Sequence, residues 1–315
     1  MIETKGMAKA EWLNVRRNGI GGSDVGAILG LSKYKSAFDV WLDKTNQTEI
    51  NTDAVSESAY FGTLLEDIVA KEFSKRTGLD VIEDTTMYQH KDYPFLFANI
   101  DRLVVGEDAI LECKTASEYL KSEWENDNVP VTYYLQVQHY LNVLDKPYAY
   151  IACLIGGNKF IYKKIERDDT IISVVTSRLV QFWKENVLTK VPPRFSGHKT
   201  ESDYLNATYG TDFQNETVKL TSEIEKEIDY LKSVQEKIAT FQTEENRLKN
   251  ELKQLLGKNH ATYGTTEKYK LSWKKSKDRT VFNESKFKTE HAELYNQYLN
   301  VKSGSKTLRI TELKK

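Results

Sequence analysis

The chain has 315 residues, with 29% charged and 11% aromatic side chains, which is enough for one large folded domain and an extension. No apolar run reaches the roughly 20 residues of a membrane span, and the N-terminus lacks an apolar signal-peptide core, so we expect a cytoplasmic protein with no membrane segment. The net charge of −1 hides an asymmetry, because residues 245–315 carry 17 Lys and Arg against 8 Asp and Glu, a net of +9.

The N-terminal region combines a short helix with a glycine-rich turn. Residues 11–17 predict a helix that runs into Gly-Ile-Gly-Gly-Ser-Asp at 19–24, followed by an apolar helix over 25–31. Ser23 or Asp24 can cap that helix, and its free N–H groups, the Ser23 hydroxyl and an arginine would bind a phosphate. A plain helix cap behind a glycine turn is the alternative.

The next predicted helix, over residues 61–73, carries an acid beside its apolar stripe. Leu65, Val69 and Phe73 repeat at helical spacing. Glu66 lies at the edge of this stripe, where its carboxylate can point into a cleft and hold a metal directly or through water. An acid that interacts with the helix dipole is the alternative.

Two apolar runs then predict an antiparallel hairpin with acids on both strands. Asp101 follows the first run, Glu112, Cys113 and Lys114 end the second, and a tight turn at 106–108 joins them. Alternation puts Glu112 and Lys114 on one face of the strand. Neighbouring carboxylates repel unless a cation joins them, and oxygen ligands suit Mg²⁺ or Mn²⁺. Lys114 can then orient or deprotonate a metal-bound water; ordinary charges on an exposed hairpin are the alternative.

After this hairpin, a helix, a second strand pair and another helix are expected. Residues 132–141 predict an amphipathic helix on which Tyr133 and Gln136 can position a phosphate or the attacking water. The strands are predicted at 147–153 and 158–165, and the following helix spans residues 171–185.

The spacing of Asp101, Glu112 and Lys114 resembles the D…(D/E)-x-K signature of the PD-(D/E)XK nucleases. Five motifs in order resemble the YqaJ-type viral recombinases, relatives of phage lambda exonuclease, over about residues 8–195. They are Trp12 with Arg16 and the turn at 20–24, Gly62-x-x-x-Glu66, Asp101, Glu112-x-Lys114, and Gln136-x-Gln138.

The resemblance implies roles for individual residues. It implies that Asp101, Glu112 and the Cys113 carbonyl bind a metal, and that Glu66 binds a second metal or its water shell. Lys114 and Gln136 would position the attacking water. Arg16 and Ser23 would bind the DNA 5′-phosphate. Because Arg17 adjoins Arg16, either of the two could be the arginine that binds the 5′-phosphate. Further candidates for DNA contact are Trp12, Arg17, Tyr133, Gln138 and Trp273.

The same resemblance implies a fold, partners and a source. The expected fold is an α/β (α+β) restriction-endonuclease-like core, in which helices flank a central mixed sheet. A ring-shaped homo-oligomer such as a trimer, and a single-strand annealing partner of the RecT or Bet kind, are expected in a bacterial host cell that carries the phage or prophage. The two cysteines, Cys113 and Cys153, both lie in apolar strand-like runs and are therefore expected to be buried thiols. Two cysteines are too few for a four-cysteine iron–sulfur site.

The last third predicts a helical extension. Residues 194–215 are polar and predict a linker or exposed loops, and 216–256 predict a long amphipathic helix or helical hairpin that ends at Gly257. A small α+β appendage is expected beyond it, with a strand at 268–273, a helix at 284–299 and a last strand at 307–311.

Trp273 lies within the basic run of this appendage. An exposed tryptophan among lysines can stack on bases while the lysines contact phosphates. A half-buried tryptophan on a lysine-rich edge strand, in a chain segment whose lysines are simply solvated, is the alternative.

The resemblance, together with the acidic hairpin, implies a Mg²⁺-dependent 5′→3′ exonuclease that acts on double-stranded DNA ends and resects DNA for phage-type single-strand-annealing recombination. The expected domains are a nuclease domain at 1–200, a linker and long helix at 201–256, and a basic appendage at 257–315. A structure-specific DNA endonuclease of the same fold and a non-catalytic DNA-end or partner-binding protein are the alternatives.

Overall fold

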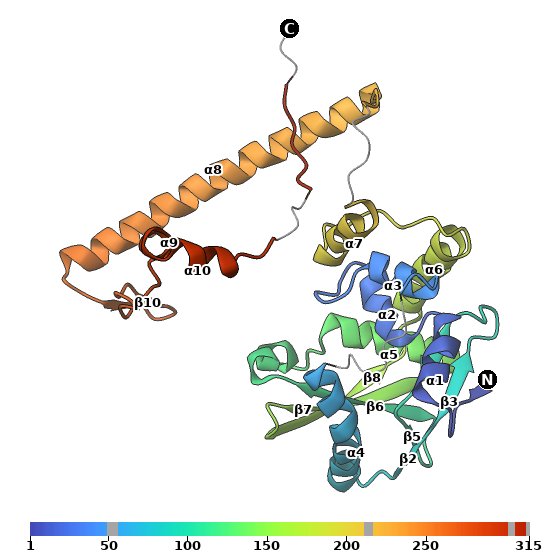
Figure 1. Cartoon of the computed structure of the whole chain (residues 1–315). Helices are drawn as coiled ribbons and strands as arrows, with labels where there is room; N and C mark the ends of the chain where they lie inside the picture. Colours follow the sequence, from blue (N-terminus) through green and yellow to red (C-terminus); the bar gives the residue numbers. More distant parts are fainter. Residues whose placement is uncertain (49–55, 211–216, 302–305, 313–315) are drawn as a thin grey trace. The chain divides into compact units, whose positions relative to one another are not determined.

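The computed structural model describes residues 1–48, 56–210, 217–301 and 306–312. Contacts divide the chain into two compact units, Met1–Thr208 and Tyr209–Lys315 (Figure 1). Within the described ranges, no helix is long and apolar enough to cross a membrane.

A five-stranded mixed sheet forms the centre of the first unit, in the order β2-β5-β6-β7-β8. The strands are β2 (Val81–Glu83), β5 (Arg102–Val104), β6 (Ala109–Ala116), β7 (Tyr148–Ile155) and β8 (Lys159–Glu166). β6 and β7 are parallel, and the other neighbours are antiparallel. Because a parallel pair needs a long crossover connection, a 3₁₀ helix (Glu118–Trp124) and α5 (Val131–Leu144) lie between β6 and β7.

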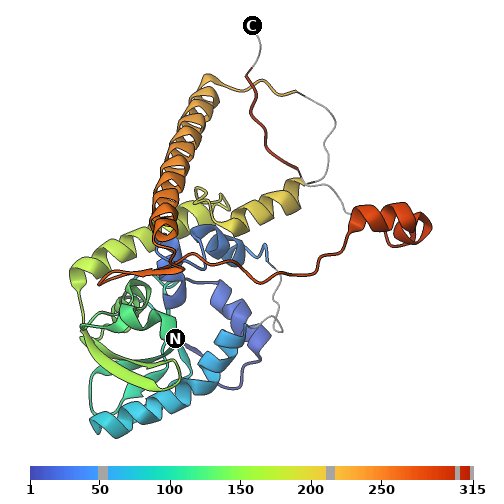
Figure 2. The ribbon, with the colours of Figure 1, turned by 90° about the vertical axis from the view of Figure 1, so that its left-hand side faces the viewer.

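Helices cover both faces of this sheet (Figures 1 and 2). On one face, Phe73 of α4 (Glu57–Thr77) shares an apolar cluster with Leu111 of β6. On the other, Val137 of α5 shares a cluster with Ile110. Adjacent residues of β6 therefore point to opposite faces, as the two-residue period of a strand requires. The expected central mixed sheet flanked by helices is confirmed.

The remaining elements of the first unit build a second layer and a small sheet. The helices are α1 (Lys9–Arg17), α2 (Gly22–Ile28), α3 (Ala37–Lys44), α6 (Asp169–Phe182), which continues into a π-helical turn (Trp183–Val187), and α7 (Lys199–Tyr209). The small antiparallel sheet joins β1 (Ile2–Glu3), β3 (Thr86–Gln89) and β4 (Phe97–Asn99). The glycine-rich turn is tied to it by paired backbone at Ile20 and Leu96.

The second unit is built around one long helix, α8 (Ser222–Lys258). It is a single continuous helix rather than a helical hairpin (Figure 2). An antiparallel strand pair, β9 (Tyr263–Thr265) and β10 (Lys270–Ser272), follows it, then α9 (Glu284–Glu290) and α10 (Ala292–Gln297).

Several expectations for the C-terminal third were wrong. The polar stretch 194–215 contains α7, whose Glu201 is buried and accepts backbone N–H bonds from residues 196–198. Gly257 lies inside α8, because that helix continues to Lys258. The helix predicted at 284–299 breaks at His291, where ψ is +48°. Residues 307–311 form no strand.

Candidate active site

The predicted acidic hairpin is present and brings its acids together. Arg102 of β5 pairs with Leu111 of β6 in antiparallel register. Asp101, immediately before β5, accepts a hydrogen bond on Oδ2 from the Cys113 N–H at 2.7 Å. The Asp101 carboxylate is therefore fixed beside the strand that carries Glu112.

Glu112 is the most buried acid of the site, with 2% of its surface exposed. Its Oε1 accepts hydrogen bonds from Lys114 Nζ at 2.5 Å and from Gln136 Nε2 at 2.6 Å. Its Oε2 is buried and has no partner among the described residues. A buried, unpaired carboxylate oxygen is costly, so this atom is available to a further ligand.

The pKa shifts follow from burial and from the closeness of these charges. Burial, and after it the charge of Glu112, raise the pKa of Asp101 to about 7. Burial also raises the pKa of Glu112. Burial alone would lower the pKa of Lys114, but the charges of Glu112 and Asp101 raise it above its ordinary value. Glu112 is buried and Asp101 half-buried, and two carboxylates this close together are stabilised by an added cation.

α5 supplies the wall of the site opposite the hairpin. Gln136 also lies 3.1 Å from the Tyr140 hydroxyl, and the Lys114 ammonium lies 5.2 Å from the centre of the Tyr133 ring. Gln138 points elsewhere: it is fully buried, and its amide binds the Glu166 carbonyl and the Asp168 N–H. The expectation that Gln138 contacts DNA is therefore wrong, because its side chain joins α5 to the end of β8.

Glu66 approaches the hairpin from the α4 face. Its Oε1 accepts a hydrogen bond from Arg102 Nη1 at 2.7 Å. Burial raises the pKa of Glu66, and the charge of Asp101 raises it further. Sequence reasoning missed Arg102, although it directly follows Asp101. Within the described residues, no three His, Cys, Asp or Glu side chains come together as a metal cage.

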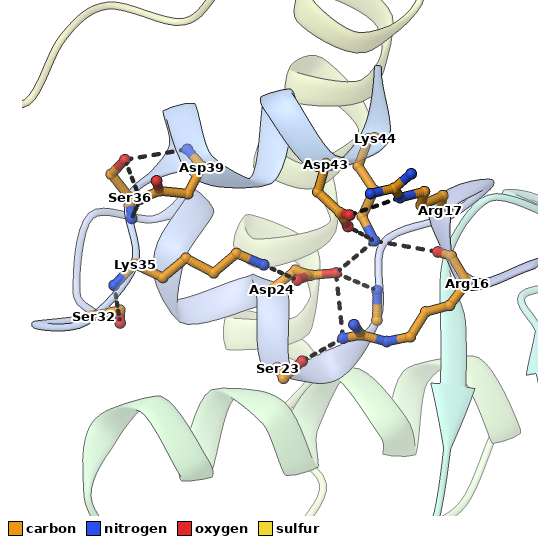
Figure 3. A network of polar contacts seen from close by, with 11 residues as sticks. Arg16, Arg17, Ser23, Asp24, Ser32, Lys35, Ser36, Asp39, Asp43 and Lys44 are labelled. Carbon is orange, nitrogen blue, oxygen red and sulfur yellow. Dashed lines mark hydrogen bonds and ion pairs between the residues drawn. The ribbon is translucent and has the colours of Figure 1, made fainter. Parts of the chain in front are cut away.

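The candidate phosphate site lies at the glycine-rich turn (Figure 3). Arg16 Nη2 donates to Ser23 Oγ at 2.5 Å, whereas Arg17 Nε pairs with Asp43 Oδ1 at 3.0 Å. The guanidinium of Arg16 also lies 5.7 Å from the centre of the Trp12 ring. The structure thus places Arg16, rather than Arg17, beside Ser23.

The candidate phosphate site and the acidic site adjoin each other. A Cβ on Gly22 would lie 2.5 Å from Tyr140 Cε1 and 2.8 Å from Gln136 Cγ, so only glycine lets α2 pack this closely on α5. A cavity of about 310 Å³ opens here, and Ser23, Tyr133 and Gln136 are among its lining residues.

Trp273 belongs to the second unit. It is 51% exposed, and its backbone N–H donates to the Thr262 carbonyl at 2.9 Å. Its ring lies near Gly257 of α8, where an added Cβ would be 3.7 Å away. The ring therefore lies against α8 while half of the residue remains exposed.

An acid at the start of one strand, faced by Glu-x-Lys on its antiparallel neighbour in a helix-flanked mixed sheet, defines the PD-(D/E)XK fold class. The model of the YqaJ-like viral recombinase domain matches residues 11–147. The chain is 44% identical over 270 residues to the protein YqaJ of Bacillus subtilis (strain 168), covering 85% of this chain and 84% of YqaJ. The chain belongs to the YqaJ-like viral recombinase family, as the motifs indicated.

Two solved structures are also similar. The alkaline exonuclease LHK-Exo of Laribacter hongkongensis has a TM-score of 0.48 and 18% identity, and the match covers 63% of this chain and 97% of that one. A phage-related exonuclease of Haemophilus somnus 129PT has a TM-score of 0.43 and 16% identity, covering 55% and 95%.

Proposed function

We propose that the chain is a Mg²⁺-dependent 5′→3′ exonuclease that resects double-stranded DNA ends during recombination. The observation that carries the proposal is the buried, unpaired Oε2 of Glu112 beside Asp101, with Lys114 and Gln136 held on the other oxygen. Such a pair of acids with an adjacent ammonium suits phosphodiester hydrolysis.

The donor set fits Mg²⁺ or Mn²⁺. Mg²⁺ is usually held by one or two carboxylates, waters and substrate phosphates, so Asp101 and Glu112 with the Cys113 carbonyl would suffice without a third acid. Glu66, engaged by Arg102, would act through the water shell or on a second ion. When bound, the metal would lower the pKa of a water molecule and offset charge on the phosphate.

The protein's own groups would orient the reactants. The Lys114 ammonium can hold the attacking water and offset charge that develops on the phosphate oxygens. Gln136 can present its amide to the same water, since Tyr140 and Glu112 fix its position. Tyr133 lines the cavity beside both groups.

The glycine-rich turn would bind the DNA end. Arg16 and Ser23 would hold a 5′-phosphate by charge-assisted hydrogen bonds. The cavity shared by Ser23 and Gln136 would then receive the terminal nucleotide, which sets the 5′→3′ direction.

The second unit would serve assembly and partner binding. Trp273 directly follows β10, and in the sequence it lies between Lys270 and Lys274, a setting that suits contact with DNA. Along α8, apolar residues such as Ile238 and Phe241 are 60% and 73% exposed. This stripe suits contact with another subunit of a ring-shaped homo-oligomer or with a single-strand annealing protein of the RecT or Bet kind. We place this activity in the cytoplasm of a bacterial host that carries the phage or prophage.

Digestion of a linear duplex and a covalently closed circle, each with Mg²⁺ or EDTA, tests the proposal. We expect Mg²⁺-dependent loss of the linear duplex and an intact circle. Cleavage of the circle would instead identify an endonuclease, and an unchanged linear duplex would identify a binding protein.

A further inference from the structure

A buried carboxylate, Asp24, lies at the centre of a cationic network beside the glycine-rich turn (Figure 3). Its side chain is fully buried, and Lys35 Nζ, Lys44 Nζ and Arg16 Nη2 lie 2.9, 3.1 and 3.7 Å from its oxygens. The Gly21 N–H also donates to Asp24 Oδ2 at 3.2 Å. Because a buried carboxylate is stable only when it is paired, Asp24 and these partners fix one another.

Among the residues that the structure describes, the network carries more positive than negative charge. Lys44 also lies 3.4 Å from Asp43, which pairs with Arg17. These ion pairs connect four cations to two carboxylates, which leaves an excess of two positive charges. Asp39 lies outside these pairs, since its carboxylate accepts hydrogen bonds from Ser36. A phosphate monoester carries up to two negative charges, whereas a phosphodiester within a strand carries one.

Only two of the four cations are accessible to a ligand. The side chains of Arg16 and Lys35 are 21% and 34% exposed, whereas those of Arg17 and Lys44 are 10% and 0% exposed. Asp24 links the accessible pair, because its Oδ1 binds Lys35 and its Oδ2 faces Arg16.

We propose that Asp24 is a positioning residue that holds Arg16 and Lys35 so that they bind a terminal phosphate monoester. The two excess charges distinguish this dianion from the monoanionic phosphodiesters within the strand. The inference rests on the proposed function, and it makes Lys35 a second phosphate-binding residue. Since Gly22 packs on Gln136, a phosphate bound here marks a DNA end beside the acidic site.

Equilibrium binding of short duplexes in EDTA tests this without cleavage. Three 5′ ends are compared: a phosphate monoester, the same phosphate as its methyl ester, and a hydroxyl. The wild type is expected to bind the monoester roughly 10- to 100-fold tighter than the hydroxyl, with the methyl ester between them. Equal affinity for the monoester and the methyl ester would refute the inference that the site selects the dianion by its charge.

Lys35→Gln is expected to lower the ratio of monoester to hydroxyl affinity by roughly tenfold or more. Lys159→Gln, at an exposed position of β8, removes the same charge elsewhere and should leave that ratio unchanged. An unchanged ratio in Lys35→Gln would refute the assignment of Lys35 as a ligand.

Asp24→Asn separates positioning from simple charge neutralisation. Removing a negative charge would strengthen phosphate binding if Coulomb attraction alone acted, whereas lost positioning of Arg16 and Lys35 weakens it. A gain in monoester affinity would therefore refute the role of Asp24. If the wild type itself shows no preference for the phosphate, the proposed phosphate site fails; if the preference exists but survives both variants, only this inference fails. Should Asp24→Asn not fold, Lys35→Gln decides.

Discussion

Replacing Gly22 by alanine should disturb the candidate active site, although Gly22 itself is not one of its acidic residues. The added methyl group would meet Tyr140 Cε1 at 2.5 Å, Tyr140 Cζ at 2.7 Å and Gln136 Cγ at 2.8 Å. The Tyr140 ring is buried and cannot turn aside freely, so α2 and α5 must separate or Gln136 must leave Glu112.

The size of this effect follows from the cost of overpacking. Extra methyl groups in a packed core cost about 1–3 kcal/mol. For a domain the size of the first unit, each kcal/mol shifts Tm by about 2–4 °C, so we expect Tm to fall by roughly 2–12 °C. Nuclease turnover at temperatures where the variant is folded should fall further, because Gln136 is displaced.

Gly21→Ala is the matched control. There the added Cβ would lie no closer than 3.4 Å to any side chain, at Arg16 Nη2, which is ordinary contact. The backbone of Gly21 is extended, with φ −91° and ψ 165°, which alanine adopts. Thermal unfolding and Mg²⁺-dependent digestion are measured for both variants. If Gly22→Ala matched Gly21→Ala in Tm and turnover, the close packing of α2 on α5 would be refuted.

Four further outcomes are expected. Glu112→Ala should abolish Mg²⁺-dependent digestion and leave the circular dichroism spectrum native; residual metal-dependent cleavage in a pure sample would contradict the assignment. Arg16→Ala should reduce the preference for 5′-phosphorylated over 5′-hydroxyl ends by about 1.5–3 kcal/mol, whereas Arg17→Ala should not; the reverse result would shift the register by one residue. Burial acts to raise the pKa of Asp24, but three neighbouring cations hold it well below its ordinary value, so its stabilisation is present above about pH 4 and is lost as pH falls further. Urea unfolding of Asp24→Asn should therefore show a weaker loss of stability with acid than the wild type, and parallel curves would contradict this. A 1–208 fragment should fold and cleave with Mg²⁺ while its DNA affinity depends less steeply on salt than that of the full chain; an insoluble fragment would contradict the division into units.

Local patterns sufficed for the hairpin, because alternation alone puts Glu112 and Lys114 on one face of β6. They also located α5, whose apolar residues recur at helical spacing. The same periodicity could not decide whether Gln138 contacts DNA or has a structural role. Only its hydrogen-bond partners, the Glu166 carbonyl and the Asp168 N–H, show that the role is structural.

Contacts between segments far apart in the chain could not be predicted from the sequence. The pairing of Arg102 with Glu66 spans 36 positions and depends on α4 lying along the sheet. The short helix α7 has a weak apolar pattern, so its composition resembles that of a linker. It is stabilised in part by hydrogen bonds to the buried Glu201, which the pattern does not reveal. The burial of Lys44 could not be predicted either, because lysines are common at helix ends. Only the folded structure shows that Lys44 lies between Asp24 and Asp43.

Release of labelled nucleotides from the two ends of a linear duplex tests the central claim most directly. With Mg²⁺, the wild type should release the 5′ label before the 3′ label, and Asp108→Asn, at the exposed turn of the same hairpin, should behave like it. Glu112→Gln should release neither label, because the proposed metal site loses a charge while the side chain keeps its size. Release of the 5′ label by Glu112→Gln at the wild-type rate would contradict the account.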